Sequence, residues 1–199
     1  MGDLKVTGLI LAGGLGRRMG SVDKGLVVFR GRTMVESVIQ RLHSQVDELL
    51  INANRNVEVY GSFGFRVVSD EIEGYAGPLA GLERGLAEAS HELIVTTPCD
   101  SPFLPFDLVA RLRSALEHCH ADLAVAKTGV QPHPVFCLAR RTLHAHLRAF
   151  LLSGGRKIDA WYGSLNSVEV SFDDEAEAFA NINTKQELET LQRPDLGNL

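Results

Sequence analysis

Short apolar runs alternate with amphipathic stretches through the first two thirds of the chain, and this alternation most constrains the fold. Apolar runs bounded by turn residues predict buried strands, whereas apolar residues at helical spacing predict helices. The predicted strands are 6–11, 48–53, 65–69, 93–97 and 121–127, and the predicted helices are 33–46, 78–89 and 106–118. A β-α-β rhythm of this kind indicates an α/β fold, with a mostly parallel central sheet covered by helices on both faces.

The rhythm loosens after Lys127. We expect strands at 135–138 and 167–172 and helices at 140–152, 156–162 and 184–191. Thr184 and Glu187 have the spacing of a helix-starting capping box. Because no repeat or long linker interrupts the sequence, we expect one domain over residues 1–199, ending in a flexible tail at 192–199.

Composition excludes several classes of protein. Of 199 residues, 25 are acidic and 20 basic, and 45% are hydrophobic, which argues against a disordered chain. No apolar run approaches the roughly 18 residues of a membrane span, and the mild acidity argues against a nucleic-acid partner. Three unpaired cysteines (Cys99, Cys119 and Cys137) predict buried thiols in a reducing compartment. With no signal peptide evident at the N-terminus, we expect a cytoplasmic protein without a membrane partner.

A glycine-rich loop follows the first predicted strand. It reads Leu-Ala-Gly-Gly-Leu-Gly-Arg-Arg-Met-Gly over residues 11–20, with Asp23 and Lys24 just beyond. Glycines let backbone N–H groups approach a ligand closely, and such amides bind anions. Arg17, Arg18 and Lys24 add positive charge. Since ligands of open α/β sheets bind at the carboxyl ends of strands, the loop predicts a phosphate site there.

Two common phosphate-binding motifs do not fit this loop. A P-loop needs a glycine followed five residues later by Gly-Lys-Ser/Thr, but Met19 stands five residues after Gly14, and Gly20 precedes Ser21. The dinucleotide motif also fails, because Met19 occupies the position of its third glycine. The loop therefore predicts a phosphate site of another kind.

The loop resembles the signature of nucleotidyltransferases with a Rossmann-like fold, and more closely that of the molybdenum cofactor guanylyltransferases, which are MobA-like. The resemblance covers nearly the whole chain. It includes Asn-Ala-Asn-Arg at 52–55, Gly-Pro-Leu-Ala-Gly at 77–81, Pro-Cys-Asp-Ser-Pro at 98–102, His-Pro at 133–134 and Asn-Ile-Asn-Thr at 181–184. The paired asparagines of the last motif point to the guanylyltransferases in particular.

The resemblance implies a three-layer fold, a transfer of GMP from GTP to molybdenum-loaded molybdopterin, and Mg²⁺ as cofactor. It implies catalytic roles for Lys24, Arg17 and Asp100, with Asp100 as the metal ligand. It also implies a GTP site and a molybdopterin site. The GTP site comprises Leu11, Ala12, Gly13, Gly14, Lys24, Asn52, Asp70, Gly77, Pro78 and Asp100, and the molybdopterin site Arg18, Gly81, Arg156, Asn181 and Asn183.

Taken without the resemblance, several of these residues have plainer interpretations. Asp100 fits a loop-bracing carboxylate as well as a metal ligand, and Asp70 fits an ordinary turn residue. The Gly77-Pro78 pair fits a capped helix start, and Arg156 fits a solvated one. Asn52 has no such plain interpretation, because asparagine is disfavoured inside a strand. A buried amide needs hydrogen-bond partners, and a nucleotide base or ribose could supply them.

Two other residues invite catalytic roles that we do not assign. His133 lies between two prolines, a setting typical of a rigid structural turn. Cys99 has no identifiable base partner and is interpreted as a packed thiol. The remaining histidines show no spacing typical of a zinc site.

A phosphate acceptor explains why no catalytic base is needed, since its second pKa is about 6 and it is ionised near neutral pH. The rival functions are a cytidylyltransferase on the same pterin, a sugar-phosphate nucleotidyltransferase, and a non-catalytic GTP-binding cofactor chaperone. A molybdenum-insertion protein and cofactor-receiving enzymes are expected as protein partners.

Overall fold

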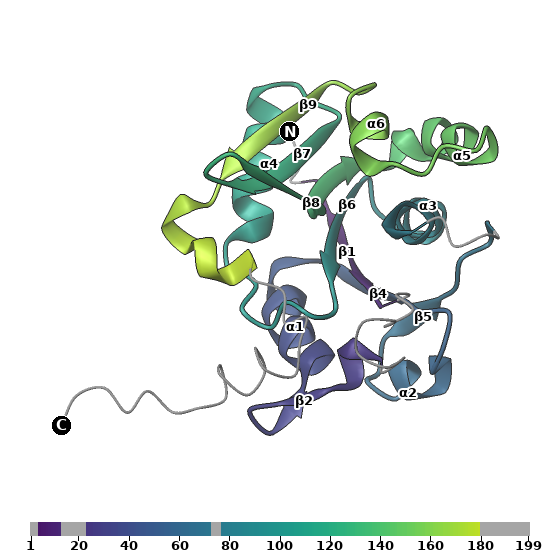
Figure 1. Ribbon diagram of the computed structural model, residues 1–199, viewed down its shortest axis with the longest axis vertical. Helices are drawn as coiled ribbons and strands as arrows, with labels where there is room; N and C mark the ends of the chain where they lie inside the picture. Colours follow the sequence, from purple (N-terminus) through teal and green to yellow (C-terminus); the bar gives the residue numbers. More distant parts are fainter. Residues whose placement is uncertain (1–3, 13–22, 73–76, 180–199) are drawn as a thin grey trace.

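The computed structural model describes residues 4–12, 23–72 and 77–179, and within them a seven-stranded sheet forms the centre of the molecule (Figure 1). The strand order is β5-β4-β1-β6-β8-β7-β9. The strands are β1 (Val6–Leu11), β4 (Glu48–Asn52), β5 (Arg66–Val68), β6 (Leu93–Pro98), β7 (Leu123–Thr128), β8 (Gln131–Arg140) and β9 (Ser167–Ser171). Only β8 runs antiparallel to its neighbours. The predicted α/β fold with a mostly parallel sheet is confirmed.

Helices cover both faces of this sheet, which confirms the three layers. The helices are α1 (Met34–Leu42), α2 (Val57–Gly61), α3 (Pro78–Glu88), α4 (Leu108–His118), α5 (His144–Leu152) and α6 (Ile158–Tyr162). One core, which includes Val38 and Leu112, packs α1 and α4 on one face. The other core, which includes Leu82, Leu147 and Trp161, packs α3, α5 and α6 on the opposite face.

The helix starts follow their sequence signals. Thr33 caps α1, and its backbone N–H donates to Glu36 at 2.7 Å in a capping box. α3 begins at Pro78 after Gly77, whose φ of +68° favours glycine. The predicted 33–46 and 140–152 helices contain short 3₁₀ turns, η3 (His43–Gln45) and η4 (Arg141–Leu143). The capping box at 184–187 and the tail at 192–199 lie outside the described residues.

Four elements were not expected from the sequence. They are η2 (Lys24–Leu26), the hairpin of β2 (Val28–Phe29) with β3 (Arg32–Thr33), helix α2, and η5 (Asp173–Phe179). The expected strand at 135–138 is also longer, because β8 forms a hairpin with β7 that begins at Gln131. Such short elements carry too few residues to show a period.

No helix in the described parts of the chain combines the length and apolar character that crossing a membrane requires.

Candidate active site

The candidate site lies where the carboxyl ends of β1, β4 and β6 meet. The chain leaves β1 for β4 on one side and returns with β6 on the other, so the strand order reverses at β1, the usual ligand crevice of open α/β sheets. Backbone bonds tie the three ends together: Ala12 N–H donates to the Asn52 carbonyl at 2.8 Å, and Cys99 N–H donates to the Leu11 carbonyl at 3.1 Å. The residues that follow these strands are therefore held on one frame.

Lys24 and Asp100 form an ion pair at this edge. Their side chains, 76 residues apart in sequence, approach to 3.2 Å between Nζ and Oδ2. Both are largely shielded, with exposed side-chain fractions of 21% and 13%. The pair therefore places one positive and one negative group together beside the strand ends.

The second carboxylate oxygen of Asp100 fits a metal ligand. Its Oδ2 receives the Lys24 ammonium, whereas Oδ1 has no hydrogen-bond partner within residues 4–12, 23–72 and 77–179. Mg²⁺ prefers one or two carboxylates together with substrate phosphates. The same described residues contain no group of three potential His, Cys, Asp or Glu ligands.

Asp23 is held by helix α2, a contact that sequence reasoning missed. The Tyr60 hydroxyl donates to Asp23 Oδ1 at 2.6 Å, and Asn56 Nδ2 donates to Oδ2 at 2.9 Å. Tyr60 is fully buried, and burial raises the pKa of its hydroxyl far above the usual range, so it remains a proton donor. Both carboxylate oxygens of Asp23 are therefore occupied. This anchors the residue that precedes Lys24.

The predicted packed thiol at Cys99 agrees with its environment. The side chain is buried, and burial raises the pKa of the thiol, the opposite of an activated nucleophile. Cys137 is also buried, but Cys119 is exposed after the end of α4, so the prediction of buried thiols is wrong for Cys119. Its backbone N–H donates to the Ala115 carbonyl at the end of the helix.

Asn52 and Asp70 form a second polar pair on the other side of β1. Asn52 is buried at the end of β4, and its amide donates to Asp70 Oδ1 at 2.8 Å. Asn54 donates to Asp70 Oδ2 at 2.8 Å and accepts from the Asp70 backbone N–H at 2.9 Å. The Asn52 amide thus has partners within the protein, Asp70 and the Val68 carbonyl at 3.3 Å, where the sequence suggested a nucleotide base or ribose. Asn54 had no assigned role, although the 52–55 motif contained it.

Helix α3 presents its N-terminus to the same edge through Gly77 and Pro78. Gly81 packs directly on the site: a Cβ there would lie 2.3 Å from Asn52 Oδ1 and 2.6 Å from Leu11 Cδ2. Position 81 therefore tolerates no side chain without movement of Asn52. The structure links Gly81 to the Asn52–Asp70 pair, whereas the resemblance implied contact with molybdopterin.

Arg156 lies away from these pairs, in the turn between α5 and α6. Its guanidinium donates to the Leu151 and Gly155 carbonyls at 2.8 and 2.7 Å, so it caps the end of α5. The remaining site residues predicted from the sequence lie outside the described residues. They are Gly13, Gly14, Arg17, Arg18, Asn181 and Asn183.

His133 takes part in packing. It stacks on Phe179 with ring centroids 4.8 Å apart, and its Nε2 lies 2.7 Å from Thr128 Oγ1. Burial lowers its pKa, which disfavours the charged form. These contacts agree with the structural interpretation of His133.

Comparisons with known proteins are consistent with this geometry. A family model described as MobA-like NTP transferase domain matches residues 8–168. The chain is 51% identical over 195 residues to a molybdenum cofactor guanylyltransferase from Ralstonia nicotianae, covering 94% of this chain and 95% of that protein. It is 49% identical over 193 residues to one from Polynucleobacter asymbioticus, covering 94% and 96%.

A solved structure has a similar fold. It is molybdopterin-guanine dinucleotide biosynthesis protein A from Archaeoglobus fulgidus, with a TM-score of 0.79 and 24% identity. The match covers 94% of this chain and 96% of that one.

Proposed function

Since the chain belongs to the MobA-like NTP transferase family, we propose that it transfers GMP from GTP to the terminal phosphate of molybdenum-loaded molybdopterin. The products are the guanine dinucleotide form of the cofactor and pyrophosphate. The chain is a nucleotidyltransferase. The structural observation that carries the proposal is the Lys24–Asp100 pair at the reversal of strand order, where a triphosphate and an attacking phosphate can meet.

The reaction needs positioning and charge neutralisation more than proton transfer. The acceptor phosphate is already ionised near neutral pH, so it attacks the α-phosphate of GTP without a base. This agrees with a site in which the described candidates are a lysine, carboxylates and amides, while His133 and Cys99 are packed elsewhere or buried. The attack forms an oxygen–phosphorus bond and expels pyrophosphate.

In this proposal Lys24 neutralises charge that grows on the α-phosphate. Amides of the glycine loop, with Arg17, hold the leaving pyrophosphate. Asp100 would hold a Mg²⁺ ion through its Oδ1, and that ion would supply further charge neutralisation for the phosphates. Tyr60 keeps the segment before Lys24 in place through Asp23.

The nucleoside and the pterin take opposite parts of the same edge in this proposal. Asp70, oriented by Asn52, is placed to accept hydrogen bonds from the nucleoside, close to the α3 N-terminus at Gly77 and Pro78. The residues that we propose for molybdopterin binding are Arg18, Arg156, Asn181 and Asn183. Gly81 packs against Asn52 and so lies between the proposed nucleoside and molybdopterin sites. For Arg156, molybdopterin binding requires its guanidinium to leave the carbonyls that it now caps.

We place the reaction in the cytoplasm, on the ground that the three cysteines are few and free. A molybdenum-insertion protein would deliver the acceptor, and cofactor-receiving enzymes would take the product, because the pterin is unstable when free.

The deciding experiment measures pyrophosphate release with molybdate-loaded molybdopterin, Mg²⁺ and each nucleoside triphosphate in turn. Release with GTP alone supports guanylyl transfer. Release with CTP keeps the mechanism but overturns the base specificity. Removal of Mg²⁺ with EDTA should stop release, and its return should restore it.

If folded protein binds GTP saturably but releases no pyrophosphate with any nucleotide, the result would favour the non-catalytic chaperone. Asp100→Asn is the matched control, because it keeps the shape of the side chain but removes its charge. If release from Asp100→Asn equals that of the unchanged protein, the pyrophosphate does not come from the proposed site.

A further inference from the structure

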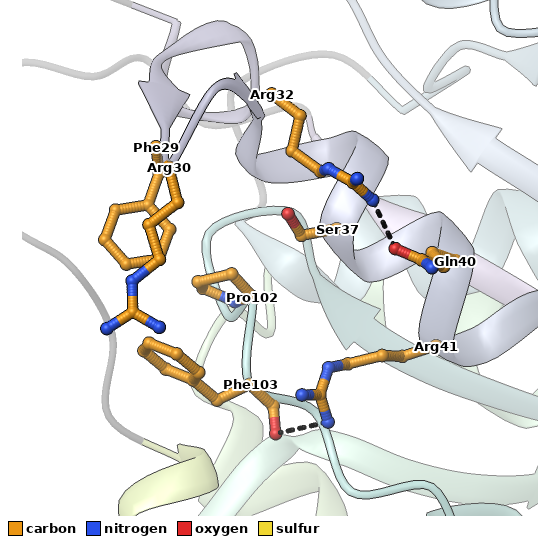
Figure 2. Close-up of a pocket in the computed structure, with 8 residues that line it drawn as sticks. All are labelled: Phe29, Arg30, Arg32, Ser37, Gln40, Arg41, Pro102 and Phe103. Atoms are coloured by element: carbon orange, nitrogen blue, oxygen red, sulfur yellow. Dashed lines mark hydrogen bonds between the residues drawn. The ribbon is translucent and has the colours of Figure 1, made fainter. Parts of the chain in front are cut away.

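An open pocket lies beside the candidate site, between the β2–β3 hairpin, α1 and the loop that follows Asp100 (Figure 2). Its lining contains three arginines and no carboxylate. The lining residues are Phe29, Arg30, Arg32, Ser37, Gln40, Arg41, Pro102 and Phe103. In a chain with a net charge of −5, this pocket concentrates positive charge on one surface. Nothing in the proposed reaction uses it.

Two of these arginines donate hydrogen bonds only to neutral groups, although the charge of Arg32 also contributes, after the hydrogen bonds from Thr33, to lowering the pKa of Glu36. Arg32 donates to the Gln40 side-chain amide oxygen, and Arg41 donates to the Leu104 carbonyl at 2.9 Å. Neither forms an ion pair with any carboxylate in the described part of the chain, and Glu36, on the same helix, is engaged by Thr33. By contrast, other surface arginines pair with carboxylates: Arg66, Arg84, Arg111, Arg113 and Arg148.

The third arginine is held over an aromatic floor. Arg30 lies 5.2 Å from the Phe29 ring centre and 5.7 Å from that of Phe103, and Figure 2 shows it beside both rings. Arg30 and Gly31 form the two-residue turn of the hairpin with φ values of +49° and +84°. Asparagine or glycine is the usual choice at the first of these positions. An arginine in this left-handed conformation is an uncommon choice, and it places a cation at the mouth of the pocket.

Exposed aromatic surface continues from the pocket. Arg41 stacks over Phe106 at 4.4 Å from its ring centre, and Phe106 is 64% exposed. Arginine and aromatic residues are enriched at protein interfaces, where they supply most of the binding energy. An acidic side chain of a partner would match the arginines of the pocket, and a neighbouring apolar side chain would match the exposed ring of Phe106.

We propose that this pocket, which we name the arginine pocket, is a docking site for an acidic segment of a partner protein. A carboxylate would enter between Arg30, Arg32 and Arg41, with an apolar neighbour against Phe103 or Phe106. Pro102 and Phe103 come two and three residues after Asp100, and Arg41 donates to the carbonyls of Phe103 and Leu104 in the same loop. A docked partner would therefore lie next to the candidate active site. The proposal concerns binding and goes beyond the proposed catalytic function.

The test uses a fluorescein-labelled peptide, Gly-Asp-Glu-Phe-Glu-Asp-Gly, and its uncharged counterpart Gly-Asn-Gln-Phe-Gln-Asn-Gly. Binding is measured by fluorescence polarisation against the full chain. The acidic peptide should bind, the uncharged peptide should bind at least about tenfold more weakly, and salt should weaken the difference because it screens exposed charges. Equal binding of both peptides, or no binding of the acidic one, overturns the proposal.

The test variant is Arg30→Asn with Arg32→Gln. Asparagine suits the turn, and glutamine can still donate to Gln40, so the hairpin should persist. The variant should lose about tenfold in acidic-peptide affinity while pyrophosphate release with free acceptor stays unchanged. Arg66→Gln, a change to an exposed arginine at β5, is the matched control and should bind the peptide normally. Unchanged affinity in the double variant overturns the assignment.

Two other occupants are separated in the same experiment. Inorganic phosphate and the unlabelled acidic peptide are each used to displace the labelled peptide. If phosphate displaces it at the same concentrations as the unlabelled peptide does, the pocket is a small-anion site and the docking proposal is wrong. If sedimentation shows a dimer that the double variant dissociates, the occupant is a second copy of this chain, which also overturns a separate partner.

Discussion

Replacing Gly81 with alanine tests how helix α3 supports the site. A Cβ at position 81 would lie 2.3 Å from Asn52 Oδ1, so the amide must move by about 1 Å to reach an ordinary contact. The Asn52 Nδ2–Asp70 Oδ1 hydrogen bond is 2.8 Å long, and a shift of that size takes it beyond the usual range of 2.7–3.2 Å. The change therefore removes one of the two side-chain amides that orient the carboxylate we propose for GTP, and leaves only Asn54 on Oδ2.

The expected rise in the KM for GTP can be estimated from the Asn52–Asp70 hydrogen bond. A bond to a charged group contributes about 1.5–3 kcal/mol, so the KM for GTP should rise about 10- to 100-fold while the KM for the acceptor stays constant. Overpacking costs about 1–3 kcal/mol of unfolding free energy, offset by about 1 kcal/mol because alanine favours helix. Steady-state pyrophosphate release and urea unfolding measure the two quantities.

Gly85 on the same helix provides the matched control. A Cβ there would lie 2.3 Å from Leu9 Cδ2, an apolar side chain of the core, with no polar contact to the site. Gly85→Ala should therefore lower stability similarly but leave the KM for GTP unchanged. A normal KM for GTP in Gly81→Ala would refute the argument. A raised KM for molybdopterin alone would instead support the pterin contact that the resemblance implied.

Three further predictions concern the rest of the site and its surroundings. Lys24→Ala and Asp100→Ala should each lower kcat/KM by about 100- to 1000-fold with the fold intact by circular dichroism, and near-normal turnover in either would remove that residue from the mechanism. Tyr60→Phe should lower the unfolding free energy by about 1–3 kcal/mol and reduce kcat more than the KM for GTP, because Asp23 loses its 2.6 Å partner; a purely structural role would leave kcat unchanged. Because burial lowers the pKa of His133, the unfolded chain binds more protons than the native one at mildly acidic pH. Stability should therefore fall as pH drops below about 6.5, and it should fall less in His133→Asn; equal urea midpoints across that range would contradict the shift.

Much of the fold was predictable because burial imposes local periodicity. The strand at 6–11 and the helix starts at Thr33 and Pro78 depend on neighbouring residues, and the structure confirms them. The direction of β8 was not predictable, because a strand's polarity is set by its partners. The short hairpin at 28–33 also escaped prediction, since its two-residue strands are too short for a pattern.

Individual site residues were recognisable from sequence, but their contacts were not. Lys24 and Asp100 stood out within motifs, yet only the sheet brings them to 3.2 Å. Asn52 was marked by its place in a strand, whereas its partner Asp70 depends on β4 and β5 lying side by side. Tyr60 carried no signal, because a buried tyrosine in a short helix resembles ordinary core.

The sequence by itself determined the class of fold, the family and the candidate residues, because these follow from apolar period, turn chemistry and motifs within a few neighbouring positions. The tertiary structure alone decided that Lys24 meets Asp100, that Gly81 presses on Asn52, and that three arginines surround one pocket. The physical reason is that such contacts join residues far apart in the chain. Strand order and helix packing set these distances, and neither can be inferred from a short stretch of sequence.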